Sequence, residues 1–267
     1  MSPIALIFCS AVLCMGIGAA PSADTRIRKA IADNDLQALR LALKSGADPN
    51  LPDARYLPPL VYAVNAGSET FVVELLNSGA NANPTNVART PLEAAFESKL
   101  ADRRIGCNVS IVRILLEHGA DVNAVFPLAG ERPLQRALEL GDAECVNAVI
   151  AAGGDWRAIS PGGKSALEAA IQGASASNNP ALISQILALG ADVNGDKTRR
   201  GGPLIEAIGR RDIPVIQQLL TLGANPCVHG GAYGISPWTA AIGGNDTDIV
   251  NLLAGYHCDS GPQVPKR

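Results

Sequence analysis

A short phrase with a central glycine returns six times along the chain. It reads SGADPN at residues 45–50. The later copies are SGANAN (78–83), HGADVN (118–123), AGGDWR (152–157), LGADVN (189–194) and LGANPC (222–227). The glycines are 33, 40, 34, 37 and 33 residues apart, and such a period predicts a solenoid of stacked units. Each unit buries its apolar face only against its neighbours, so we expect one elongated domain.

A second phrase follows each glycine after about twelve residues. Its copies are PPLVYAV (58–64), TPLEAAF (90–96), RPLQRAL (132–138), SALEAAI (165–171), GPLIEAI (202–208) and SPWTAAI (236–242). Proline suits the first turn of a helix, where its missing N–H would be unpaired anyway. A serine or threonine before it caps the next amides. An apolar helical pattern then leads to the next glycine, which ends the helix. Each unit is therefore predicted to hold two helices and a turn.

These paired phrases resemble the ankyrin repeat family from about Thr25 to Gly255. The resemblance implies an all-α solenoid of about seven helix-turn-helix units with β-turn fingers, the fingers being the turns that join successive units. The first and last units would act as caps. We expect a signal peptide at 1–23, an ankyrin repeat domain at 24–258 and a polar C-terminal tail at 259–267.

The chain departs from the family pattern at the fourth place of the second phrase. The family usually carries histidine there, and this chain carries Val61, Glu93, Gln135, Glu168, Ile205 and Thr239. The hydrogen bonds of that histidine must therefore be replaced. The third and fifth units also carry extra residues between their helices. Loops tolerate added length cheaply, so a longer loop without a role and a special contact are both open.

The start of the chain has the pattern of a signal peptide. Residues Ile4–Leu13 are apolar, small residues follow, and no charged side chain precedes Asp24. This length suits a signal-peptide core, although the first residues lack the usual lysine or arginine. We expect export with cleavage near Ser22 or Ala23, to the periplasm if the cell is bacterial. Secretion from the cell and an uncleaved N-terminal anchor are the alternatives.

Composition and charge exclude several classes of protein. The chain is 47% hydrophobic and 18% charged, which is the balance of a folding chain. Only 4% of residues are aromatic, so the core must be made of alanine, leucine, isoleucine and valine. The net charge of -3 gives no positive field for nucleic acid or an anionic membrane. We expect a monomer with no nucleic-acid partner and no membrane span after removal of the leader.

Motifs for catalysis are weak. The segment Ala158–Ser165 satisfies a permissive phosphate-loop pattern that contains Lys164. A phosphate loop follows a buried strand, whereas AAGGDWR precedes this segment, and Ser165 already occupies a position of the second phrase. No HExxH, GxSxG or C-x-x-C pattern occurs. We predict no enzyme activity, no cofactor and no metal site, with a nucleotide-binding enzyme kept as an alternative.

Four cysteines remain after the leader is removed, and three complete pairings are possible. On the ankyrin units, Cys107 lies in the insertion of the third unit and Cys145 begins the second helix of the fourth. Cys227 lies in the last finger, and Cys258 follows the last helix. These positions favour Cys107 with Cys145 and Cys227 with Cys258. Free buried thiols are the alternative, above all for Cys145.

The family resemblance also implies where a partner binds, since ankyrin proteins usually use the fingers and the exposed side of the inner helices. Tyr56, Phe126 and Tyr233 lie in fingers, and an aromatic side chain at a polar tip is a candidate anchor. Trp156, in contrast, replaces a valine and is expected to pack inward. The basic residues beside the anchors are Arg55, Arg89, Arg132, Arg157, Lys164, Lys197, Arg199 and Arg200. They favour an acidic partner, or they only keep this edge soluble.

The predicted function is a non-enzymatic protein–protein interaction module that presents a rigid surface to a protein partner. Neutralising a toxic enzyme or supporting an envelope enzyme would suit an exported protein of this kind. A secreted host-directed effector and an assembly scaffold are the alternative functions.

Overall fold

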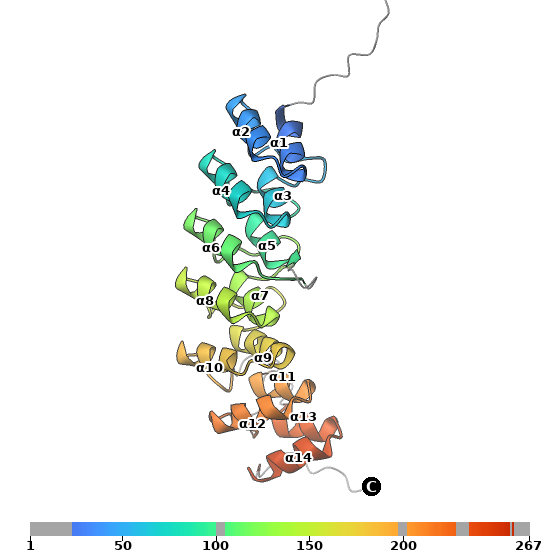
Figure 1. Cartoon of the computed structure of the whole chain (residues 1–267). Coiled ribbons are helices and arrows are strands. Elements are labelled where there is room, and N and C mark those ends of the chain that lie inside the picture. Colours follow the sequence, from blue (N-terminus) through green and yellow to red (C-terminus); the bar gives the residue numbers. More distant parts are fainter. Residues whose placement is uncertain (1–22, 100–104, 197–201, 228–234, 257, 259–267) are drawn as a thin grey trace, which may run out of the picture. The chain divides into compact units, whose positions relative to one another are not determined.

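The computed structural model describes residues 23–99, 105–196, 202–227, 235–256 and 258. The predicted leader up to residue 22 and the predicted tail at 259–267 lie outside the described residues. The chain divides into two compact parts, Met1–Asp48 and Pro49–Arg267, which are considered one at a time. We call them the first unit and the second unit, and the repeats within them are called helix pairs. Figure 1 labels their helices. Within the described part of the chain, no helix is both long and apolar enough to cross a membrane.

The first unit contains one helix pair, α1 (Ala23–Ala32) and α2 (Leu36–Lys44). The two helices pack through buried apolar residues that include Ile27 and Leu39. The carboxylate of Asp35 caps α2 by accepting a hydrogen bond from the Ala38 amide at 2.9 Å.

The second unit contains six helix pairs. They are α3 (Pro59–Asn65) with α4 (Glu69–Asn77), α5 (Pro91–Phe96) with α6 (Val109–Glu117), α7 (Pro133–Leu140) with α8 (Ala143–Ala151), α9 (Ala166–Ser177) with α10 (Ala181–Ala188), α11 (Pro203–Gly209) with α12 (Ile213–Thr221), and α13 (Pro237–Gly243) with α14 (Thr247–Ala254). With the pair of the first unit, the described residues contain seven helix pairs. The prediction of an all-α solenoid of about seven units is confirmed.

Successive pairs of the second unit pack side by side. The inner helices contact one another in the order α3, α5, α7, α9, α11 and α13, and the outer helices α4, α6 and α8 contact in the same way. Five of the six copies of the second phrase contain a leucine at the third place, and this leucine is buried in all five. These are Leu60, Leu92, Leu134, Leu167 and Leu204. Burial of these leucines between neighbouring pairs supplies the apolar core that one pair alone lacks.

The helices begin and end as the two phrases predict. Thr90, Ser165 and Ser236 cap α5, α9 and α13 by accepting hydrogen bonds from the third amide of each helix. The glycine of the first phrase follows each outer helix and takes φ values of 81–100°, a conformation that other residues rarely adopt. From α4 onward, the fingers run from this glycine to the next inner helix.

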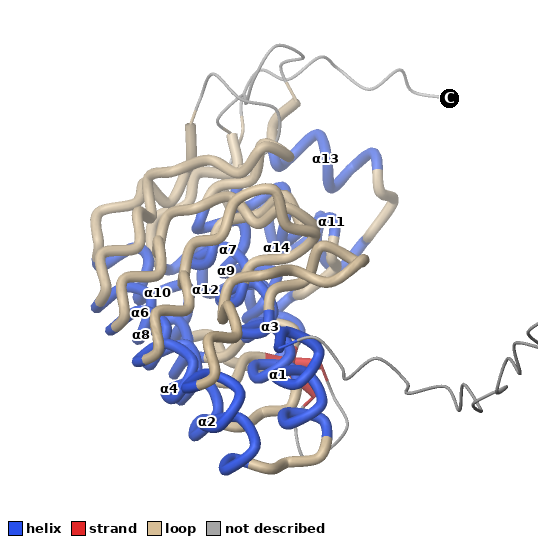
Figure 2. The backbone as a smooth tube through the Cα atoms, turned by 90° about the horizontal axis from the view of Figure 1, so that it is seen from above, coloured by secondary structure: helices blue, strands red, loops and turns tan. Residues whose placement is uncertain are grey.

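We number the fingers in chain order. They are the first (49–58), second (79–90), third (119–132), fourth (153–165), fifth (190–202) and sixth (223–236) fingers. Figure 2 shows the loops of the second unit stacked along one side of its helices. We call the exposed side of these fingers the finger edge.

The insertion between α5 and α6, in the third helix pair, contains two short strands that the sequence did not predict. Strands β1 (Ser98–Lys99) and β2 (Ile105–Gly106) pair in antiparallel fashion, with Ser98 opposite Gly106. Two residues per strand are too few to produce a visible alternating pattern. A disulfide then joins Cys107, directly after β2, to Cys145 in α8. The insertion is therefore fastened to the next unit.

Candidate functional site

A ladder of asparagine side chains connects the fingers. The carboxamide of Asn83 accepts a hydrogen bond from the Asp121 amide and donates one to the Gly119 carbonyl, both at 2.7 Å. One side chain thus binds two backbone groups of the next finger. The equivalent bonds run from Asn50 to Gly79 and Asn81, from Asn123 to Gly153 and Asp155, and from Asn194 to the Asn225 amide. The ladder fixes the spacing of the fingers.

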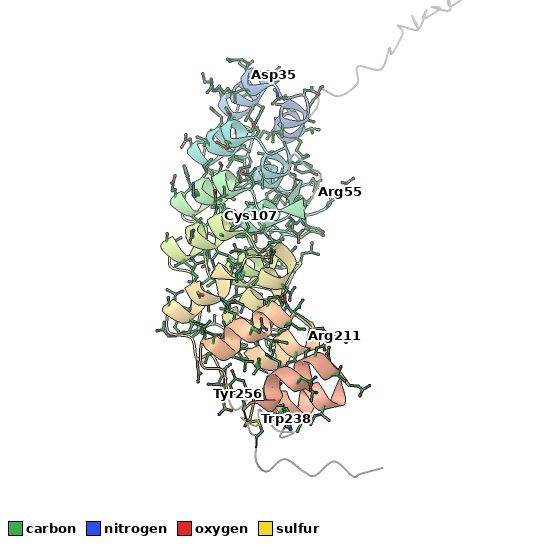
Figure 3. All side chains as sticks on the ribbon, turned by 60° about the horizontal axis from the view of Figure 1, so that its bottom comes forward. Asp35, Arg55, Cys107, Arg211, Trp238 and Tyr256 are labelled. Atoms are coloured by element: carbon green, nitrogen blue, oxygen red, sulfur yellow. A yellow bond between two sulfur atoms is a disulfide. The ribbon has the colours of Figure 1, made fainter. Side chains whose placement is uncertain are left out.

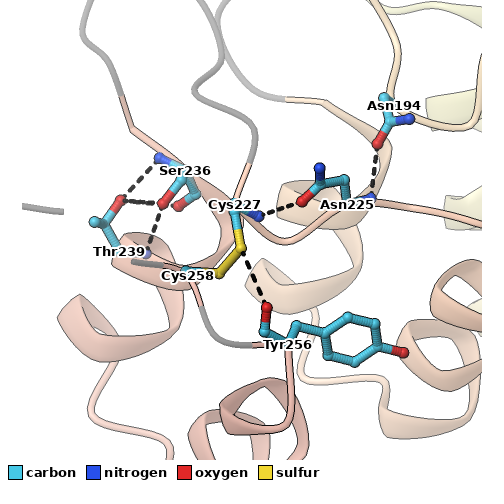
Figure 4. The surroundings of a disulfide bond; sticks show 7 residues. All are labelled: Asn194, Asn225, Cys227, Ser236, Thr239, Tyr256 and Cys258. Atoms are coloured by element: carbon cyan, nitrogen blue, oxygen red, sulfur yellow. Dashed lines mark hydrogen bonds between the residues drawn. A yellow bond between two sulfur atoms is a disulfide. The ribbon is translucent and has the colours of Figure 1, made fainter. Parts of the chain in front are cut away.

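The sixth finger is held by a disulfide. Cys227 stands where four of the other five fingers carry the ladder asparagine, and it is joined to Cys258 beyond α14 (Figure 4). The Cα atoms are 5.1 Å apart in this pair and 6.5 Å apart in the pair of Cys107 and Cys145. Both are the pairings expected from the repeat positions. Asp142 lies within 4.8 Å of the Cys107 and Cys145 sulfurs, but the disulfide removes the thiolates that a metal would bind.

Two buried polar side chains stand at the position of the family histidine, and each connects an inner helix to a finger by hydrogen bonds. Glu93 is completely buried, and its carboxylate accepts hydrogen bonds from the amides of Leu128 and Ala129 at 3.0 and 2.8 Å. Gln135 donates to the carbonyls of Ala158 and Lys164 at 2.9 and 3.1 Å. Glu93 and Gln135, which depart from the family pattern, therefore connect α5 to the third finger and α7 to the fourth finger.

Four of the six fingers carry exposed apolar side chains. Of the nine large apolar side chains that are exposed in the described residues, six lie in the fingers. They are Leu51, Tyr56, Val125, Leu128, Ile159 and Ile235. Only Tyr56 among them was singled out from the sequence. A larger apolar surface that stays in contact with water is typical of an interaction site.

The predicted aromatic anchors have different positions. Tyr56 is 64% exposed in the first finger, whereas Phe126 is 1% exposed and packs against Phe96 with 5.7 Å between ring centroids. The prediction that Phe126 is a surface anchor is wrong. Its N–H donates to the Glu131 carbonyl and its own carbonyl accepts from Gly130, both at 2.8 Å, so the long third finger turns back here and Phe126 joins the core. Tyr233 lies outside the described residues.

The predicted basic edge is largely used inside the molecule. Arg89 pairs with Glu97, Arg132 donates to the Asn123 carbonyl, and Lys164 pairs with Glu139. All three are half-buried, and contact of these residues with a partner stays a prediction. Arg55 and Arg157 are exposed, and Arg55 extends away from the ribbon in Figure 3. Lys197, Arg199 and Arg200 lie outside the described residues.

The internal charges form a network along the inner helices. Arg136 of α7 lies 3.8 Å from the Glu97 carboxylate and 3.9 Å from that of Glu131. Burial raises the pKa of Glu131, and the neighbouring carboxylate of Glu139 raises it further, while Arg136 and Lys164 oppose the shift. These charges therefore mainly connect neighbouring units.

The segment Ala158–Ser165 does not have the geometry of a phosphate loop. It is part of the fourth finger, and the α8 helix rather than a strand precedes it. The ammonium group of Lys164 contacts Glu139 and donates to Gln172 at 2.8 Å. Ser165 caps α9 together with Glu168. The residues that suggested a nucleotide site are thus engaged in finger and helix contacts.

Comparisons with known proteins agree with this architecture. The family described as ankyrin repeats (3 copies) matches residues 27–126. The structure is similar to the ankyrin repeat domain of human ASB11, with 26% identity, a TM-score of 0.67 and coverage of 89% of this chain and 99% of that one. The ankyrin repeat domain of Bcl-3, a member of the IkappaB family, is similar in fold, with 22% identity, a TM-score of 0.70 and coverage of 87% and 99%.

One further protein is similar over part of its length. Zygote-specific protein 3 of Chlamydomonas reinhardtii is 35% identical over 125 residues, which is 46% of this chain. The chain spans only 31% of the length of that protein.

The stacked helix pairs and joined fingers define a repeat protein of the class that serves protein–protein interaction. The ankyrin repeat model matches residues 27–126, and the described helix pairs have the fold of ankyrin repeat domains. This fold is generally a binding module rather than an enzyme.

Proposed function

We propose that the protein is an exported, non-enzymatic binding protein that holds a protein partner on its finger edge. The exposed apolar side chains of the fingers, Tyr56 among them, carry the proposal, because a few anchors such as tyrosine at the centre of an interface supply most of its affinity. The asparagine ladder and the buried Glu93 and Gln135 hold the fingers in place before binding. A preformed surface loses little conformational entropy when the partner binds.

Two observations support export. The first is the signal-peptide pattern of residues 1–23. The second is the pair of disulfides, since disulfides form and persist in oxidising compartments. In a bacterial cell the proposed compartment is the periplasm, where the partner would be an envelope enzyme or a toxic one. Determining the N-terminus of the mature protein tests export: a start near Ser22 or Ala23 supports it, and a cytoplasmic chain that retains Met1 contradicts it.

Affinity capture from the native cell fraction tests the binding surface. The finger variant carries Tyr56→Ala, Leu128→Ala and Ile159→Ala. The control carries Leu41→Ala and Leu222→Ala, which remove exposed leucines outside the fingers. We expect the finger variant to bind the captured partner about tenfold more weakly or worse, a loss of about 1.4 kcal/mol, and the control to bind like the wild type. Equal capture by both variants would reject the finger edge as the binding surface.

A further inference from the structure

The asparagine ladder has a gap between the fourth and fifth fingers. The fourth copy of the first phrase ends in Arg157 where the neighbouring copies carry Asn123 and Asn194. By analogy with the other rungs, the two groups left at the gap are the Asp192 amide and the Gly190 carbonyl. Among the hydrogen bonds of the described residues, neither group receives a side-chain partner. The fifth finger is therefore fastened differently from the third and fourth.

A pocket of about 380 Å³ opens at this gap. Gly190 and Asp192 line one side, and Trp156, Arg157, Ile159 and Leu167 line the other. The half-buried Trp156 ring lies over the fifth finger, because a methyl group on Gly190 would be 3.7 Å from it. The Arg157 guanidinium lies over this ring, 4.4 Å from its centroid. The pocket thus combines an aromatic wall with the two backbone groups of the missing rung.

We infer that this pocket binds the carboxamide of an asparagine or glutamine side chain of the partner protein, which completes the missing rung. The inference rests on the proposed function and specifies the chemistry of one contact. In the rungs of Asn50, Asn83 and Asn123 a single carboxamide accepts from an amide and donates to a carbonyl of the same finger. The partner side chain would make the same two bonds with Asp192 and Gly190.

Charged side chains and backbone peptides do not meet this requirement. A carboxylate has no donor, and ammonium and guanidinium groups have no acceptor, so Arg157 itself cannot complete the rung. A trans backbone peptide directs its N–H and C=O to opposite sides, whereas a carboxamide presents both at one end. The carboxamide is also neutral, so it enters beside Arg157 and Asp192 without the cost of desolvating a charge. The methylene groups of the side chain would lie against Trp156 and Leu167.

Small model compounds test the site without the partner. The probes are the N-acetyl N-methylamides of glutamine, glutamate and methionine, added at millimolar concentrations to ¹⁵N-labelled mature protein. We expect the glutamine compound to shift the Asp192 amide and the Trp156 indole resonances in NMR spectra in a saturable way, and the other two to leave them unchanged. Equal shifts from the glutamate or methionine compound, or none from glutamine, would overturn the inference.

Two substitutions at one position separate the missing rung from the guanidinium. Arg157→Asn supplies a ladder side chain and is expected to abolish the shifts. Arg157→Ala removes the guanidinium, leaves the gap open and should retain them. Binding to the Arg157→Asn protein, or its loss in the Arg157→Ala protein, would refute the site. If the carboxamide fails to bind while the finger variant still loses its partner, this site is rejected and the proposed function stands.

Discussion

The buried carboxylate of Glu93 is the connection between α5 and the third finger. It accepts hydrogen bonds from the amides of Leu128 and Ala129, and a substitution to alanine leaves both donors without a partner. We expect Glu93→Ala to lower the free energy of unfolding by about 1.5–3 kcal/mol, as for lost hydrogen bonds to a charged group. Urea denaturation measures the change. The exposed Glu117→Ala on α6 is the control, and an equal loss in both proteins would show that the finger contact contributes nothing.

The two finger aromatics show what a sequence can predict of a single residue. The repeat assigned both Tyr56 and Phe126 to fingers, and both assignments are correct. It did not predict that Tyr56 faces the solvent and Phe126 faces the core. The direction of Phe126 depends on a turn closed by hydrogen bonds to Gly130 and Glu131, in a finger that is longer than its neighbours. The first and fourth fingers close similar turns that are one residue shorter, with the polar residues Asp53 and Ser160 at the place of Phe126, so those fingers gave no signal for an aromatic core residue there.

At the scale of elements, α7 and α9 approach each other most closely at Gly173. A methyl group on this glycine would lie 1.7 Å from the Leu138 carbonyl oxygen, so the helices would have to move apart. We expect Gly173→Ala to cost about 1–3 kcal/mol of the free energy of unfolding, as overpacking does. Gly209→Ala in α11 is a matched control because no atom lies within 4 Å of its added methyl group. Thermal denaturation that ranks both variants equal would contradict this close packing.

The charge network of α7 predicts a pH dependence. The raised pKa of Glu131 means that the folded state binds its proton more tightly than the unfolded state does. Its contribution to stability therefore falls as the pH rises from the ordinary value of 4.5 through the raised pKa. We expect Glu131→Gln, which mimics the protonated form, to be more stable than the wild type at pH 7 and to lose this advantage at pH 4.

Urea denaturation at both pH values measures the difference. Glu144→Gln, at an exposed position in the first turn of α8, is the control for removing one negative charge. A gain in stability for Glu131→Gln that is the same at both pH values would show that the titration of Glu131 is not its cause.

The sequence predicted most elements and few of the contacts between them. Proline, hydroxyl caps and positive-φ glycines are local signals, and the helices begin and end at these residues. The β1–β2 pair forms within a single insertion from strands of two residues each, and the network around Arg136 joins side chains from different helix pairs. The ladder is an intermediate case: its asparagines recur in the first phrase, and a missing one is visible as Arg157. That signal was available in the sequence, but its meaning required the hydrogen bonds.

At the scale of the whole molecule, the finger edge differs in character from the prediction. The sequence suggested a basic surface for an acidic partner, whereas the described fingers expose apolar side chains and aspartates beside the basic residues Arg55 and Arg157. Sequence position alone placed Arg89 and Lys164 on fingers without showing that Glu97 and Glu139 lie within reach. Arg89 and Lys164 therefore serve contacts inside the molecule.

Stacking also determines which helix pairs lose stability when a disulfide is removed. In a repeat protein each unit contacts only its neighbours, so damage at one end spreads little. The bond between Cys227 and Cys258 holds the sixth finger beside the end of α14, and the bond between Cys107 and Cys145 lies in the middle of the second unit. Loss of either bond should cost about 2–4 kcal/mol, but the two losses should be distributed differently.

Hydrogen exchange measured by mass spectrometry resolves this distribution. In the Cys227→Ala, Cys258→Ala variant we expect faster exchange in α13 and α14 and unchanged exchange in α3 and α4. In the Cys107→Ala, Cys145→Ala variant we expect faster exchange in α6 and α8 and in the inner helices packed against them. Peptide mapping of the non-reduced wild type must first show both bonds, because four free thiols would remove the premise. Nearest-neighbour coupling confines the faster exchange to the helix pairs beside the lost bond. A uniform increase in the exchange rate across the second unit in both variants would instead mean that this unit unfolds as one cooperative body.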